Sequence, residues 1–193
     1  MATFPDPITD LPQSGPQSLV LGGGCFWCTE AVYLALDGVT AVTPGYAGGS
    51  ASSANYDAVC SGTSGHAEVI RIDYDADHIS LGQLLKVFFS VAHDPTQLNR
   101  QGNDRGSQYR SAVFCRDAAE VGIVRGYIDQ LNKAGVFDSA IVTTLEPLET
   151  FYPAEDYHRN YAARNPLQPY ILFAASPKVS KLKQAYPDKL KRS

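Results

Sequence analysis

Two cysteines enclosing two aromatic residues form the segment of this chain with the clearest potential for chemistry. Cys25, Phe26, Trp27 and Cys28 follow three consecutive glycines, which allow a tight turn between an apolar run and a helical pattern. We therefore expect Cys25 at or near a helix N-terminus, where unpaired N–H groups and the helix dipole favour an anion. A thiol in that place is predicted to have a lowered pKa and to be a good nucleophile.

Cys28 is compatible with three roles: resolution of an oxidised Cys25, one ligand of a metal site, or no reaction at all. The other candidate ligands are Cys60, His66 and Cys115, and their spacing matches no paired-ligand pattern of a zinc site. We therefore predict no metal site and favour resolution. Residues three apart on a helix have Cβ atoms roughly 5–6 Å apart, whereas a disulfide needs about 3.8 Å. Closing the bond therefore requires an adjustment of the first helical turn.

One acid and two phenols are further candidates. Glu68 lies at the mouth of a predicted strand, and an inward orientation would raise its pKa and suit it to proton donation near neutral pH. An outward orientation would leave an ordinary strand-end acid. Tyr56 and Tyr109 are either phenolic donors or packing residues. Phe26 and Trp27 cannot share one helix stripe, so either one belongs to the core or both form an apolar pocket beside the thiol.

Hydrophobic periodicity predicts the elements that position these groups. Strands are expected at 19–21, 39–49, 67–74, 109–115 and 140–145, and helices at 29–36, 81–89, 117–133 and 154–164. Ser80 is the expected N-cap of the second helix. The segments 50–65 and 93–107 are predicted to be loops. This order fits an α+β sandwich in which helices pack on a mixed or antiparallel sheet.

Composition indicates one globular, soluble domain. The chain has 193 residues, of which 44% are hydrophobic and 19% charged. We expect an extended arm at 1–17, a single catalytic domain at 18–170 and an irregular basic tail at 171–193. We see no signal-peptide pattern, and no apolar run approaches the roughly 20 residues of a membrane span. Four cysteines are too few for a disulfide scaffold, so a cytoplasmic protein with reduced thiols is expected.

Charge is unevenly distributed along the chain. The net charge of −4 argues against nucleic acid as the main partner. From Lys178 onward there are six basic residues and one acid, so the rest of the chain carries a net charge of −9. This tail is either a solvated terminus or a contact with an acidic partner or with the body of the domain.

Seven short motifs, in this order, resemble those of the A-type peptide methionine sulfoxide reductases. They are GCFW at 24–27, GYAGG at 45–49, Tyr56, GHAE at 65–68, HDPT at 93–96, QGND at 101–104 and QYRS at 108–111, and YPAEDYH at 152–158 fits as well. The resemblance covers about 19 to 170. It excludes the arm and the tail.

The resemblance implies a two-layer α/β sandwich and the reduction of the S epimer of methionine sulfoxide, free or in proteins. It implies that Cys25 is the nucleophile and that Glu68 protonates the sulfoxide oxygen. Tyr56 and Tyr109 would donate hydrogen bonds to that oxygen. The reaction leaves a sulfenic acid on the cysteine.

The resemblance also assigns the substrate-binding residues and the partners. Phe26 and Trp27 would hold the methyl group, and Asp104 would organise the site or bind the substrate backbone. It implies no bound cofactor, because an external dithiol, taken to be thioredoxin, restores the enzyme. It leans towards a monomer.

The chain departs from many relatives in its resolving cysteine. Those relatives carry resolving cysteines in a glycine-rich C-terminal tail, whereas no cysteine follows Cys115 here. We infer that Cys28 resolves directly and forms a Cys25–Cys28 disulfide. Cys60 is the alternative, and a one-thiol cycle is also compatible. Cys115 lies on an apolar strand and is predicted to be buried and inert.

Two other functions fit the residues alone. A general dithiol–disulfide oxidoreductase would use Cys25 and Cys28 but would not need Glu68. A non-enzymatic protein would bind oxidised methionine segments or a metal without turnover.

Overall fold

A six-stranded mixed sheet forms the centre of the computed structural model, which describes residues 3–192. Its strands are β1 (Pro16–Gly23), β2 (Val39–Ala47), β3 (Ala67–Asp75), β6 (Ser111–Cys115), β7 (Thr144–Pro147) and β8 (Tyr152–Pro153), in the order β7-β6-β1-β3-β2-β8. Neighbouring strands are antiparallel except for the parallel β6–β7 pair. Two further strands, β4 (Arg100–Gln101) and β5 (Asp104–Arg105), form a separate hairpin. The predicted α+β class with a mixed sheet is confirmed.

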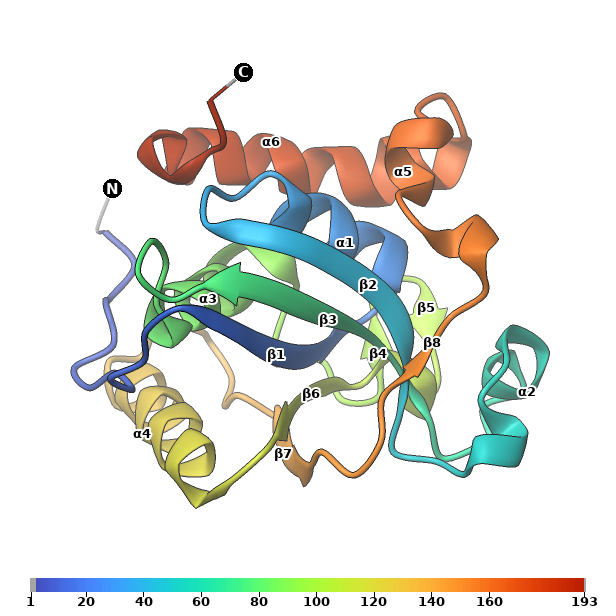
Figure 1. The fold of residues 1–193 in the computed structure, drawn as a ribbon, viewed down its shortest axis with the longest axis horizontal. Helices are drawn as coiled ribbons and strands as arrows, with labels where there is room; N and C mark the ends of the chain where they lie inside the picture. Colours follow the sequence, from blue (N-terminus) through green and yellow to red (C-terminus); the bar gives the residue numbers. More distant parts are fainter. Residues whose placement is uncertain (1–2, 193) are drawn as a thin grey trace.

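Six α-helices accompany the sheet in the described residues. They are α1 (Phe26–Leu34), α2 (Tyr56–Cys60), α3 (Leu81–Val87), α4 (Ala118–Lys133), α5 (Tyr161–Arg164) and α6 (Ser176–Ala185). Helix α1 contacts β2 and β3 on one face of the sheet, and α6 runs beside α1 (Figure 1). Helix α4 contacts β6 and β7 at the other end of the sheet. Helices α1 and α4 therefore pack on the sheet as a second layer, whereas α2 lies to one side of it (Figure 1).

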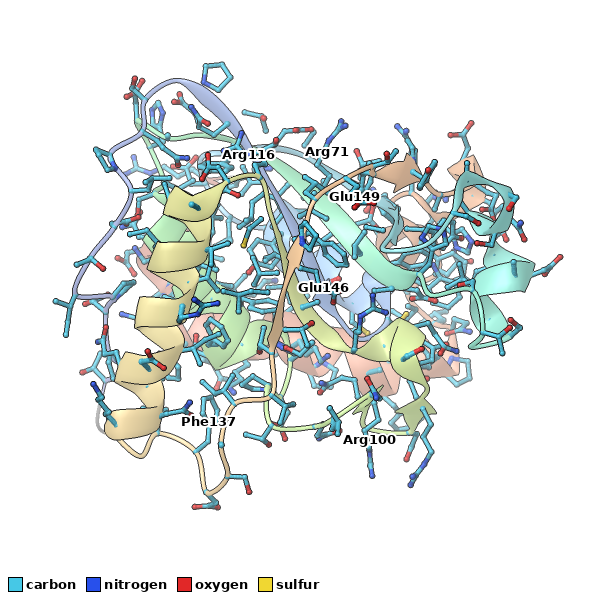
Figure 2. All side chains as sticks on the ribbon, turned by 90° about the horizontal axis from the view of Figure 1, so that it is seen from below. Arg71, Arg100, Arg116, Phe137, Glu146 and Glu149 are labelled. Carbon is cyan, nitrogen blue, oxygen red and sulfur yellow. The ribbon has the colours of Figure 1, made fainter. Side chains whose placement is uncertain are left out.

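Alternation along β1 separates the main core from a smaller cluster. Leu19 and Leu21 belong to the core beneath the helices, whereas Val20 belongs to a cluster on the opposite face. Figure 2 shows this opposite face, with Arg71 labelled. The guanidinium of Arg71 lies 5.3 Å from the centroid of the Phe151 ring. Burial on both faces fixes the register of β1, because a slip of one residue would exchange the two sets of side chains.

The turn from β1 to α1 requires glycine. Gly24 has a φ of +86°, which residues with a Cβ rarely adopt. A Cβ there would also lie 2.7 Å from the side chain of Gln101. The close approach of Gln101 brings the β4–β5 hairpin against the start of α1, and this contact sets one wall of the site.

Local signals explain where two helices begin. Ser80 and Gln83 form a complete capping box at the start of α3, as the predicted N-cap requires. The side chain of Asp117 accepts a hydrogen bond from the backbone N–H of Glu120 and caps α4.

The expectation of an irregular tail at 171–193 is wrong. Residues Ile171–Ala175 form a wide helical turn that continues into α6. Pro177 lies in the first turn of α6, where a missing N–H costs little, so it begins the helix instead of breaking it. Leu182 is fully buried, which shows that the tail is part of the packed structure.

Smaller differences concern the loops and the last strands. The segment 50–65 contains α2, and 93–107 contains the β4–β5 hairpin. The strand expected at 140–145 begins only at Thr144, and β8 follows it. The helix expected at 154–164 is reduced to α5 and a 3₁₀ turn, because Asn160 has a left-handed φ of 50°.

The arm before β1 lies against α3 and α4. Tyr127 donates a hydrogen bond of 2.6 Å to the carbonyl of Pro5, and Lys86 pairs with Asp6 at 2.7 Å. The division of the chain at 17/18 and 170/171 stays a prediction. Within residues 3–192, no helix is both long and apolar enough to cross a membrane.

Candidate active site

Cys25 is the N-cap of α1, as the turn of three glycines predicts. Its carbonyl accepts hydrogen bonds from the N–H groups of Cys28 and Thr29 at 3.1 and 3.4 Å. The first N–H of the helix, on Phe26, donates a hydrogen bond of 3.1 Å to Glu68 Oε2. The first turn of α1 therefore already has a carboxyl group as its partner beside the thiol.

Glu68 points inward from β3 and is buried. Burial raises its pKa to about 8, and the negative charge of Asp104 adds to this, while the hydrogen bond from the Phe26 N–H opposes it. At neutral pH the carboxyl is therefore mainly protonated. One oxygen accepts from the helix, and the acid retains a proton that it can donate.

A cavity of about 170 Å³ joins the thiol to this acid, and we call it the thiol–acid cavity. Its lining consists of Cys25, Phe26, Trp27, Tyr56, Glu68, Asp104, Tyr109 and Tyr170. The structure thus brings together seven of the eight residues expected from the sequence. The eighth, Cys28, lies outside this cavity.

The two expected phenols come from different elements. Tyr56 is the first residue of α2, and Tyr109 ends the 3₁₀ turn Ser107–Tyr109 before β6. Burial raises the pKa of both phenols. Cys60 and then Glu68 raise the pKa of Tyr56 further, and Glu68 raises that of Tyr109. Both remain protonated across the neutral range and can donate hydrogen bonds into the cavity.

The two thiols form a coupled pair. A hydrogen bond from Cys25 lowers the pKa of Cys28 to about 7, and the charge of Lys178 contributes, although burial opposes both. Burial raises the pKa of Cys25 well above its usual value, with further contributions from Cys28 and Glu68. The predicted lowering of the Cys25 pKa by the helix N-terminus is therefore wrong for the reduced protein. The pair instead holds one proton between two sulfurs near neutral pH.

Tyr170 connects Cys28 to Asp104. The Cys28 thiol donates to the Tyr170 hydroxyl at 3.9 Å, and that hydroxyl donates to Asp104 Oδ2 at 2.5 Å. Tyr170 is the last residue covered by the family resemblance, and no role was predicted for it. No local pattern would have found it, because its partners lie on other elements.

An aromatic cluster forms the apolar wall. The indole N–H of Trp27 donates to His158 Nδ1 at 3.0 Å, and the Trp27 ring stacks on Tyr161 with centroids 3.9 Å apart. Phe26 packs between Tyr46 and His158. His158 is fully buried and accepts at Nδ1, so its proton is on Nε2. It lies within the YPAEDYH motif, but sequence analysis gave it no role.

The remaining cysteines lie elsewhere. Cys60 is exposed at the end of α2, whereas Cys115 is buried in β6, as predicted. His66 binds the backbone of the 49–50 turn, with bonds of 3.1 Å from the Gly49 N–H and 2.8 Å to the Ser50 carbonyl. Across residues 3–192, no group of three or more His, Cys, Asp or Glu residues could hold a metal ion.

Two neighbouring thiols, Cys25 and Cys28, beside the protonated Glu68 carboxyl are the groups that a thiol-dependent oxidoreductase needs. A family model described as peptide methionine sulfoxide reductase matches residues 17–190, and the chain therefore belongs to this family. It is 48% identical to a peptide methionine sulfoxide reductase MsrA 2 of Synechocystis, over 97% of this chain and 90% of the relative. It is 51% identical to an MsrA of Natronomonas pharaonis, over 88% and 95% of the two chains.

Solved structures agree with this assignment. The reduced form of Mxr1 from Saccharomyces cerevisiae superposes with a TM-score of 0.73 at 34% identity, over 84% of this chain and 90% of that chain. Methionine sulfoxide reductase A of Corynebacterium diphtheriae gives a TM-score of 0.67 at 34% identity, over 81% and 78%. Mxr1 in complex with Trx2 gives 0.51 at 28% identity, over 80% and 90%.

Proposed function

We propose that this enzyme reduces the S epimer of methionine sulfoxide, free or in proteins, with Cys25 as the nucleophile. The observation that carries this proposal is the shared cavity of the Cys25 sulfur and the Glu68 carboxyl. A sulfoxide has a positive sulfur and a negative oxygen. In this cavity the Cys25 nucleophile can attack the sulfoxide sulfur, and the Glu68 proton donor can protonate the sulfoxide oxygen.

The reduction step transfers the sulfoxide oxygen to Cys25. The proton held between the thiols moves to Cys28, and the Cys25 thiolate attacks the sulfoxide sulfur. Glu68 protonates the oxygen while Tyr56 and Tyr109 donate hydrogen bonds to it, a preorganised arrangement that stabilises the developing charge. Methionine leaves, and Cys25 becomes a sulfenic acid.

The resolving step uses Cys28. Its sulfur attacks the sulfenic sulfur of Cys25, a Cys25–Cys28 bond forms, and the oxygen leaves as water after protonation. The geometry supports Cys28 over Cys60, because Cys28 lies one helical turn from Cys25 and both residues belong to one buried cluster. The lowering of the Cys28 pKa to about 7 beside Cys25 agrees with this assignment. Cys60 is exposed at the end of another helix.

Phe26 and Trp27 are the proposed walls for the substrate methyl group. The hydrogen bond to His158 and the stacking on Tyr161 hold the Trp27 indole in place. Asp104 is proposed to orient Tyr170, to which it is hydrogen-bonded. We further propose that the enzyme acts as a cytoplasmic monomer without a bound cofactor, and that thioredoxin supplies its electrons.

Replacing Glu68 tests this proposal against general disulfide exchange. Glu68→Gln keeps the shape of the side chain but removes its transferable proton, so sulfoxide reduction should fall by about 10²–10⁴-fold. Disulfide exchange between Cys25–Cys28 and a small thiol should change little. Glu30→Gln is the matched control. Glu30 is also a buried glutamate, but it belongs to α1 and lies outside the thiol–acid cavity. Equal sulfoxide reduction by both variants would contradict the proposal.

A further inference from the structure

A second cavity, of about 440 Å³, opens onto the two thiols from another side. Its lining is drawn from the start of α1, the β4–β5 hairpin and the segment that begins the C-terminal helix: Cys25, Cys28, Gln101, Gly102, Asn103, Asp104, Tyr170, Phe173, Ala174, Pro177 and Lys178. It shares Cys25, Asp104 and Tyr170 with the thiol–acid cavity. Neither Glu68 nor Tyr56 lines it, so this second cavity lacks the groups that sulfoxide reduction needs.

The two cysteines that line this second cavity are not equally exposed. Cys25 is 9% exposed, whereas Cys28 is 1% exposed and packs against Ile171 and Ala175. A thiolate that enters here therefore reaches Cys25 first. In thiol–disulfide exchange the other sulfur then leaves with the electron pair, and a sulfur of lower pKa leaves faster.

Two groups are placed to hold a departing Cys28 thiolate. The Tyr170 hydroxyl contacts the Cys28 sulfur at 3.9 Å, and it can turn its proton from Asp104 towards a Cys28 thiolate. Lys178, half-buried on α6, lines the same cavity, and its positive charge acts on Cys28. Across residues 3–192, Lys178 forms no ion pair within 4.0 Å. Asp104 lines the same cavity, and its negative charge opposes the effect of Lys178 on the Cys28 pKa. Lys178, a residue of the basic tail, thus contributes positive charge beside Cys28.

The rim of the second cavity carries an apolar side chain in water. Phe173 is 83% exposed, and its neighbour Leu172 is also exposed. A large apolar side chain in solvent beside a reactive centre is typical of a contact surface for another protein. A protein partner, unlike a small thiol, would cover Phe173 while its own thiol reached the sulfurs below.

We propose that the second cavity receives the active-site thiol of the dithiol reductant protein, which attacks Cys25 and releases Cys28 as a thiolate beside Lys178 and Tyr170. This inference rests on the Cys25–Cys28 disulfide of the proposed function. The first reductant sulfur bonds to Cys25 as the Cys25–Cys28 bond breaks. The second reductant thiol then attacks the first, Cys25 leaves, and the partner departs as an oxidised disulfide after giving up two electrons and two protons. Substrate and reductant thus reach Cys25 through different cavities.

Trapping the mixed disulfide tests which sulfur is attacked. The enzyme is oxidised with methionine sulfoxide in the absence of reductant, and its disulfide is mapped by mass spectrometry. A thioredoxin whose second active-site cysteine is serine is then added, and the mixed disulfide is mapped. Attachment at Cys25 is the expected result. Attachment at Cys28 or Cys60 would overturn this inference alone, whereas the absence of a Cys25–Cys28 disulfide before mixing would overturn the resolving step as well.

The docking surface is tested with Phe173→Asp. We measure the ratio of thioredoxin-supported to dithiothreitol-supported kcat/KM. This ratio should fall by about tenfold or more, as expected for a central aromatic contact in an interface. Ile8→Asp is the matched control, because Ile8 is 82% exposed and its backbone N–H donates a hydrogen bond to Gln130 of α4. The N-terminal arm lies on the opposite side of the molecule from α5 (Figure 1). An unchanged ratio for Phe173→Asp, or an equal fall for Ile8→Asp, would overturn the docking surface.

The role of Lys178 is tested through the pH dependence of disulfide reduction. Removing a nearby positive charge raises a thiol pKa, so Lys178→Met should slow reduction by thioredoxin and shift its pH profile upward. Lys178→Arg should restore the profile, and Lys181→Met, an exposed change on the same helix, should leave it in place. An identical profile for Lys178→Met and the wild type would overturn this assignment.

Discussion

The backbone N–H of Phe26 donates a hydrogen bond of 3.1 Å to Glu68 Oε2, which ties the first turn of α1 to the acid on β3. This bond uses a helix N-terminal donor that would otherwise favour a Cys25 thiolate. It also orients the carboxyl so that its other oxygen can carry the proton. The N-terminus of α1 therefore stabilises a Cys25 thiolate less, but Glu68 is fixed beside Cys25 as a proton donor.

The pH dependence of kcat/KM should be bell-shaped. The first proton leaves the thiol pair near pH 7, since the pKa of Cys28 is lowered to about 7, and the rate should rise through that value. The pKa of Glu68 is raised to about 8, so its proton is present below that pH and is lost as the pH rises through it. Steady-state assays across this range should show both limbs. Glu68→Gln should lose the falling limb, and its persistence in that variant would assign the limb to another group.

Cys28→Ser should complete a single turnover and then stall with thioredoxin as the reductant. Its Cys25 can still take the sulfoxide oxygen, although more slowly because Cys28 no longer accepts its proton, and no neighbouring thiol is available to form the disulfide. Rapid-quench measurement of methionine released per enzyme gives the first turnover, and a coupled thioredoxin assay gives the steady state. Cys60→Ser and Cys115→Ser are the controls and should sustain turnover. Undiminished multiple turnover by Cys28→Ser would remove Cys28 from the resolving step.

Trp27 fluorescence should report the redox state of the thiol pair. The indole lies on the first turn of α1 between both cysteines, and this turn must adjust to bring their sulfurs within bonding distance. The emission spectrum should therefore differ between reduced and oxidised enzyme, and Trp27 is the only tryptophan in the sequence. Identical spectra in the two states would argue against a Cys25–Cys28 disulfide.

Leu182→Ala should destabilise the whole domain. Leu182 is fully buried on α6, so its truncation should cost about 2–5 kcal/mol of unfolding free energy. Leu172→Ala, at an exposed position of the same C-terminal segment, should cost far less. Urea unfolding followed by circular dichroism measures both. An unfolding free energy of Leu182→Ala equal to that of the wild type would show that α6 does not pack on the domain.

Local patterns predicted the parts of the fold that depend on neighbouring residues. The strand, glycine turn and helix around Cys25 and the N-cap at Ser80 follow from residue types a few positions apart, and the structure has them. Helix α6 lies in the segment that was expected to be irregular, and its Pro177 is tolerated because it lies in the first helical turn.

Long-range contacts explain what the sequence could not predict about the site. Burial by the rest of the chain reverses the expected pKa shift of Cys25, and burial depends on the tertiary structure. Tyr170 reaches Asp104 across 66 positions of sequence, and Trp27 reaches His158 across 131. Motif resemblance found the residues of the thiol–acid cavity except Tyr170, but it gave no indication of these supporting contacts.

Turnover of racemic dabsyl-methionine sulfoxide with dithiothreitol, resolved by chiral chromatography, tests the central claim most directly. Wild type should consume half of the racemate and leave the R epimer, Cys115→Ser should do the same, and Cys25→Ser should consume none. These results would establish the reaction, its stereochemistry and the nucleophile together. An inactive wild type, or a Cys25→Ser variant that still consumes the S epimer, would contradict the account.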